Sequence, residues 1–236
     1  MKRGLKMKRT VVFLMILMLM MASATAFAAG KIRVTQENFH LIESYGKYGY
    51  AYAKVENVGD RQIKVHAGIL EIFDENGDVI TSTDYLRNYA EYLQPDEYTY
   101  VYLRAEIENE NMKPDDFMLT ITGKSDNTYQ TQRLPVEMKY EEDIRARYGT
   151  TNYMSALVTN DTDEPVYNIT VLLVLLDNEE NILYMESTGL GRNTAIMPGS
   201  SVMFREEVSS SFKEYFENEG LNPMVVDAIA YTNINQ

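Results

Sequence analysis

Two histidines, His40 and His66, are the side chains of this sequence best suited to acid–base catalysis. A histidine beside a serine could activate its hydroxyl as a nucleophile, but no Gly-x-Ser-x-Gly segment presents a serine for that role. A glycine-rich phosphate loop, a His-Glu-x-x-His segment and cysteine are also missing from the sequence. We therefore predict a protein that is not an enzyme, with no catalytic residue, cofactor or disulfide. A hydrolase built on one of the histidines is the alternative.

Oxygen-bearing side chains follow one another at residues 74–78, in the order Asp-Glu-Asn-Gly-Asp. The pattern Asp-x-Asn-x-Asp begins many calcium loops, but such a loop also needs a later glutamate and flanking helices. Here Asn76 and Gly77 lie between two apolar runs, which is a strong signal for a β-hairpin. We predict a hairpin turn in which the Asp74 carboxylate caps backbone donors, and no metal site.

Tyrosines gather in two short stretches of the first half, where each alternates with a small or apolar residue. Alternation places such rings on one face of a β-strand. A tyrosine offers a rigid apolar ring and a hydroxyl, a combination enriched at protein interfaces, and a ring face can also stack on a sugar. Three interpretations are open: an outward partner-binding face, cross-strand packing that stabilises the sheet, or burial against the second half. The residues are Tyr48, Tyr50, Tyr52, Tyr98, Tyr100 and Tyr102.

The elements that carry these tyrosines occur twice along the chain. At one constant, ungapped offset, ten residues of the first half recur unchanged in the second half, and several apolar positions recur as similar residues. Such internal similarity predicts a tandem duplication of one structural unit. The identical residues are Tyr45, Gly46, Tyr50, Ala53, Val55, Asn57, Asp60, Leu70, Asp74 and Pro95, which recur as Tyr148, Gly149, Tyr153, Ala156, Val158, Asn160, Asp163, Leu173, Asp177 and Pro198.

The hydrophobic pattern within each copy has a period of two, as expected for strands with one face on a core. Short strands separated by turn signals predict an all-β fold of two tandem antiparallel β-sandwiches, at residues 31–138 and 139–236. We expect a short connection at about residues 132–144. A capping box at Ser211–Glu214 and a closing glycine at Gly220 predict one short helix in the second copy, packed against its own sandwich.

Each copy resembles the FxLYD-type domains of exported bacterial proteins. The resemblance lies in a strand that ends in Val-x-Asn, a long apolar strand that ends in aspartate, and a proline before a later strand. The signature pentapeptide falls on Leu70–Asp74 and Leu173–Asp177, where only the aspartate matches literally and a leucine stands at the first position. The resemblance implies immunoglobulin-like sandwiches in an extracytoplasmic setting, and it transfers no catalytic residue.

The first 28 residues have the three parts of a secretory signal peptide: basic residues, an apolar run from Val11 to Met21, and an Ala26-Phe27-Ala28 cleavage site. An uncleaved anchor is the alternative, although the run is shorter than the ~20 residues of a spanning helix. Cleavage changes the formal net charge from −13 to −18, because it removes five basic residues and no acidic one. So acidic a chain is not expected to bind nucleic acid. No later segment is apolar enough to span a bilayer, so we expect no membrane insertion after cleavage.

These features together predict a secreted, non-enzymatic binding or structural module at the bacterial cell exterior, either released or associated with the cell wall. The leading hypothesis is recognition of a protein or glycan of the envelope or host through the tyrosine-rich face of the first copy. The alternative is a structural or self-associating spacer of the envelope without a specific ligand. The absence of tryptophan weakens the case for a glycan.

Overall fold

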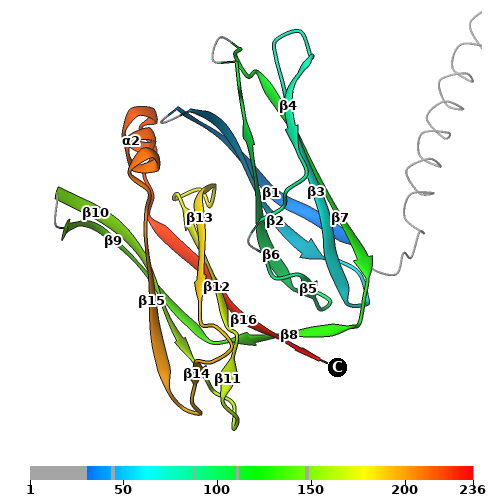
Figure 1. Cartoon of the computed structure of the whole chain (residues 1–236), viewed down its shortest axis with the longest axis vertical. Helices are drawn as coiled ribbons and strands as arrows, with labels where there is room; N and C mark the ends of the chain where they lie inside the picture. Colours follow the sequence, from blue (N-terminus) through cyan, green and yellow to red (C-terminus); the bar gives the residue numbers. More distant parts are fainter. Residues whose placement is uncertain (1–30, 44–45, 88, 110–111, 147–148, 236) are drawn as a thin grey trace, which may run out of the picture.

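The computed structural model describes residues 31–43, 46–87, 89–109, 112–146 and 149–235 (Figure 1). The predicted signal peptide lies outside these residues, as do Tyr45 and Tyr148 of the repeat. None of the helices found in the described ranges has the length and apolar character needed to cross a membrane.

The first half contains two antiparallel sheets that face each other. In each sheet the inward side chains are small or aliphatic, and Ala51 and Leu103 of one sheet pack with Leu70 and Ile72 of the other, all four completely buried. The first sheet has the order β1-β2-β6, with β1 at Ile32–Glu43, β2 at Lys47–Asn57 and β6 at Tyr98–Glu106. In the second, β3 (Ile63–Phe73) lies between β7 (Asp116–Ser125) on one side and β4 (Val79–Thr83) with β5 (Tyr92–Leu93) on the other.

The second half repeats this strand order. One sheet has the order β15-β10-β9, with β15 at Ser201–Glu207, β10 at Gly149–Thr159 and β9 at Val136–Ala146. The other has the order β13-β12-β16-β8, with β13 at Ile182–Gly189, β12 at Thr170–Leu176, β16 at Val225–Asn235 and β8 at Tyr129–Leu134, while the short strands β11 (Val166–Tyr167) and β14 (Ala195–Ile196) pair with each other. The predicted all-β antiparallel fold is confirmed.

The segment that joins the halves is a pair of strands, and the prediction of a short connection there is wrong. β8 pairs with β16, and β9 follows directly in the facing sheet, with Pro135 between them. The expected boundary after residue 138 therefore falls inside β9. The charged residues that suggested a connection lie on an edge strand, where one row of side chains faces solvent.

The two aspartates that end the signature pentapeptides cap hairpin turns, as predicted. Asp74 Oδ1 accepts hydrogen bonds from the backbone N–H groups of Asn76 and Asp78, both at 2.9 Å, and Gly77 adopts a φ of 82°. Asp177 Oδ1 accepts from the backbone N–H groups of Glu179 and Asn181, both at 2.8 Å. The repeated aspartate therefore has a structural role in folding the turn.

The repeated asparagines, Asn57 and Asn160, are completely buried and make the same set of hydrogen bonds. Asn57 Nδ2 donates to the carbonyl oxygens of Arg61 and Leu93, and Oδ1 accepts from the backbone N–H of Gly59. In the second half, Asn160 Nδ2 donates to the carbonyls of Glu164 and Ile196 and Oδ1 accepts from the N–H of Thr162. Each side chain thus ties the turn after its own strand to a short strand of the same half, β5 for Asn57 and β14 for Asn160.

Helix α2 (Ser210–Glu219) is present, but the predicted capping box is not. Its N-cap is Ser209, which makes no side-chain cap hydrogen bond. Gly220 closes the helix in the left-handed conformation with φ 66°, as expected. Phe212 packs on Tyr184 of its own half, with ring centroids 4.7 Å apart, and also on Tyr50 of the first half.

Candidate functional site

The six tyrosines predicted as site residues share one face of the sheet β1-β2-β6. β2 and β6 are antiparallel neighbours, and their register places Tyr52 opposite Tyr102. Because the residues between the tyrosines are small or apolar and face Leu70, Ile72 and the rest of the inner core, the rings point away from it. We call the set Tyr48, Tyr50, Tyr52, Tyr98, Tyr100 and Tyr102 the tyrosine face.

The tyrosine face packs against the second half, so the expectation of an open outward patch is wrong for its centre. Tyr52 retains 1% of its surface exposed and Tyr100 retains 2%, while the other four rings are partly buried. Tyr52 and Tyr100 belong to one apolar cluster with residues of β12, β13, β16 and α2. Figure 1 shows the halves side by side, with α2 at one end of their contact. Burial against the second half, one of the three interpretations, is the observed arrangement.

A single carboxylate of the second half receives two hydroxyls of the tyrosine face. Asp227 Oδ2, on β16, accepts hydrogen bonds from Tyr100 Oη at 2.7 Å and from Tyr98 Oη at 3.1 Å. Burial, followed by the adjacent Asp227 charge, raises the pKa of Tyr98 to about 12. Burial and the hydrogen bond to Asp227 raise the pKa of Tyr100 still further above its ordinary value. Both hydroxyls therefore remain protonated donors throughout the neutral range.

Aromatic contacts extend across the rest of the tyrosine face. The Tyr50 ring meets Phe212 edge to face, with centroids 5.0 Å apart, and the Tyr52 and Tyr102 centroids are 5.7 Å apart. Such pairs add about 0.5–1.5 kcal/mol beyond the area that they bury. Tyr48, at the end of the face, carries the Arg104 guanidinium 4.9 Å from its ring centroid. The face is therefore an aromatic contact surface with hydroxyl donors at one end.

His40 joins this contact instead of a catalytic group. It is buried on β1, and its Nε2 lies 2.9 Å from the carbonyl oxygen of Ile182 on β13. Donation from Nε2–H to that carbonyl leaves Nδ1 as an acceptor, 3.4 Å from Tyr215 Oη. Burial lowers the pKa of His40, although the Ile182 carbonyl and Asp177 favour the charged form. His66, the other histidine, is exposed.

The lowered pKa of His40 makes the stability of the protein depend on pH. As the pH falls through about 6.5, the ordinary pKa of histidine, the unfolded chain takes up a proton that the folded chain resists, so the free energy of unfolding falls with the pH. We expect His40→Gln, which keeps a donor for the Ile182 carbonyl, to flatten this dependence in urea titrations at pH 5, 6 and 7. The exposed His66→Gln variant is the matched control, and equal slopes in the wild type and His40→Gln would contradict the prediction.

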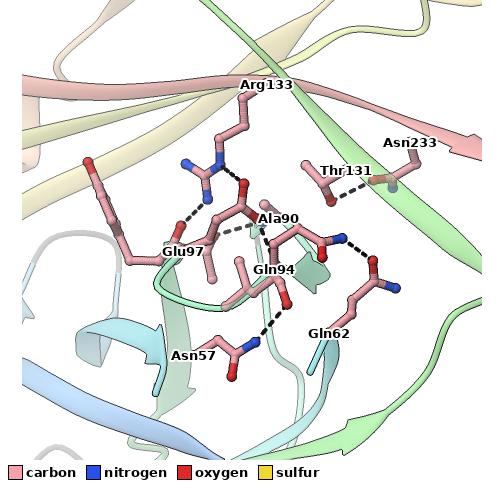
Figure 2. Close-up of polar contacts among 11 residues, drawn as sticks. Asn57, Gln62, Ala90, Gln94, Glu97, Thr131, Arg133 and Asn233 are labelled. Carbon is pink, nitrogen blue, oxygen red and sulfur yellow. Dashed lines mark hydrogen bonds and ion pairs between the residues drawn. The ribbon is translucent and has the colours of Figure 1, made fainter. Parts of the chain in front are cut away.

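Polar contacts of β8 form a second part of the contact between the halves (Figure 2). Arg133 Nε lies 3.3 Å from Glu97 Oε1, and the Arg133 guanidinium also donates to the carbonyl oxygen of Tyr98. Figure 2 shows Gln94 directed toward Gln62, and Gln62 donates in turn to the carbonyl of Tyr129 at 2.8 Å. These contacts hold both ends of β8: Arg133 near its end contacts the residues at the start of β6, and Tyr129 at its start contacts Gln62.

The sequence predicted the tyrosines but not their partners. Asp227 and Arg133 are single charged residues without a neighbouring motif, so only the fold reveals that they meet the tyrosine face. The described residues contain no group of three or more histidine, cysteine, aspartate or glutamate side chains arranged to hold a metal.

Comparison with known proteins identifies no family. No family model matches the sequence, and no curated protein matches it. The solved structure of red sea bream transglutaminase is similar over 85% of this chain and 29% of its own length, with 12% sequence identity and a TM-score of 0.22. A score at that level supports no inference about fold or activity.

Proposed function

We propose that this chain is an exported, non-enzymatic structural module in which two FxLYD-like, immunoglobulin-like sandwiches are held together as one rigid spacer at the bacterial cell exterior. The burial of Tyr52 and Tyr100 between the halves is the observation that carries the proposal. Tandem domains joined only by a linker move relative to one another by default, whereas an apolar contact holds them in one orientation. The acidic surface suits a module that stays soluble and repels anionic polymers.

The same burial argues against recognition of a protein or glycan through the tyrosine face. An aromatic face binds a partner when its rings are free to be covered by that partner. Here the central rings are already covered, and two hydroxyls are already bound to Asp227. The tyrosine face therefore serves an internal contact in this proposal.

A binding assay separates the spacer from the recognition hypothesis. The chain from Ala29 onward is incubated with purified cell-wall peptidoglycan and with a glycan panel, beside the triple variant Tyr98→Ser, Tyr100→Ser and Tyr102→Ser. We expect no saturable binding by either protein. Saturable binding by the wild type that disappears in a folded triple variant would overturn the spacer and restore a recognition site. Circular dichroism of the variant establishes that it is folded.

A further inference from the structure

The outer edge of β7 carries no strand in the part of the chain that the structure describes. β7 pairs with β3 along its whole length, on the side of β3 away from β4 (Figure 1). In the second half the equivalent strand is β16, and its outer edge is covered by β8. Among the described residues the two halves thus differ at one sheet edge, which a strand covers in the second half and none covers in the first.

The repeat indicates where a counterpart of β8 would lie in the first half. Val136, just after β8, pairs with Val158, as Val34 pairs with the equivalent Val55. The counterpart of β8 would therefore be the residues directly before Val34, most of which precede the described part of the chain. If the signal peptide is removed after Ala28, as predicted, only Ala29 and Gly30 remain before the described part of the chain.

β7 has the features of an edge that pairs with another strand. It has ten residues, and no charged side chain lies between Asp116 and Lys124. In the long edge strands β1 and β9 the register shift places the extra residue in the edge strand itself, whereas the shift in the pairing of β7 with β3 places it in β3, at His66. A long regular edge presents a row of unpaired backbone groups, which natural proteins usually block with bulges or charges.

We propose that the edge of β7 is the dimerisation surface of this protein, and that its occupant is β7 of a second copy, antiparallel about a two-fold axis at Thr120. In this register Asp116 of each copy lies opposite Lys124 of the other, and Leu119 lies opposite Ile121 on the side facing the core. The pairing forms two opposite-charge contacts and extends the apolar layer between sheets across the axis. A parallel arrangement would place like charges together.

The charges of β7 select a second copy over an unrelated strand. Asp116 and Lys124 lie at equal distances on either side of Thr120, so the strand is complementary to itself when reversed. The outward side chains Met118, Thr120 and Thr122 are exposed, and no hydrogen bond joins them to another element except that from Thr122 to Ala67. This inference does not rest on the tyrosine face or on the proposed spacer function.

Substitution at the two-fold axis tests the dimer. We expect the chain from Ala29 onward to show a concentration-dependent dimer mass by size exclusion with light scattering. Thr120→Glu places two carboxylates side by side and Thr120→Lys places two ammonium groups, so each should weaken dimerisation by about tenfold or more. An equimolar mixture of the two variants should recover the dimer, because each pair then has opposite charges. Ser82→Glu on the exposed edge strand β4 is the matched control.

A second set of variants tests the register. Asp116→Lys and Lys124→Asp should each weaken the dimer, and the double exchange should restore it. A chain that stays monomeric at every concentration would overturn the proposal, as would a dimer that Thr120→Glu does not weaken or a mixture that remains monomeric. Protection of β7 amides from hydrogen exchange in such a monomer would instead assign the edge to the chain's own N-terminal residues.

Discussion

Asn160→Ala is expected to lower the free energy of unfolding by about 3 kcal/mol, and Asn57→Ala by a similar amount. Each side chain is completely buried and satisfies two carbonyl oxygens and one backbone N–H. Alanine would leave the carbonyl of Ile196 buried without its donor, and an unsatisfied buried polar group costs about 1–3 kcal/mol. Urea titration followed by circular dichroism measures the change.

An exposed asparagine provides the control for this prediction. Asn76 lies in the Asp74 turn and makes only a 3.3 Å side-chain contact with Asp74, so Asn76→Ala should change the free energy of unfolding by less than about 0.5 kcal/mol. Losses below about 1 kcal/mol in both Asn57→Ala and Asn160→Ala would mean that the buried hydrogen bonds do not anchor the turns. The repeated Val-x-Asn motif would then lack the structural explanation given to it here.

Asp227→Ala is expected to destabilise the contact between the halves by about 2–3 kcal/mol. The carboxylate accepts hydrogen bonds from Tyr98 and Tyr100, and bonds to a charged acceptor are worth about 1.5–3 kcal/mol each. The buried Tyr100 hydroxyl would lose its acceptor. Thermal unfolding at neutral pH measures the loss, and Asp84→Ala, at an exposed position after β4, provides a carboxylate control. An equal effect of the two alanine variants would contradict the assignment of Asp227.

Local pattern was sufficient to predict the strands and turns. The alternation around Tyr52 correctly separated the core face from the tyrosine face, because the side-chain period of a strand is two. Asn76 and Gly77 correctly predicted a hairpin, and Gly77 adopts the positive φ that the turn needs. Both halves show the same strand order, as the internal repeat of the sequence indicated.

Contacts between segments that lie far apart in the sequence could not be predicted from the local pattern. Nothing near Asp227 in the sequence indicates that it lies beside Tyr98 and Tyr100, since the pairing depends on how two folded halves meet. The charges at residues 141–143 suggested a connection, although the segment is an edge strand whose exposed side accepts charge. The capping box failed for a local reason: the N-cap is Ser209, two residues before the predicted Ser211, so the helix begins at Ser210 and Ser211 lies inside it.

A double-mutant cycle between Tyr100 and Asp227 tests the central claim most directly, because the two residues meet only if the tyrosine face packs on the second half. The free energies of unfolding of the wild type, Tyr100→Phe, Asp227→Ala and the double variant are measured by urea titration. We expect the double variant to be more stable than the sum of the single losses predicts, with a coupling of about 1.5–2 kcal/mol. Additive losses, with a coupling near zero, would contradict the contact and leave the tyrosine face free to bind a partner.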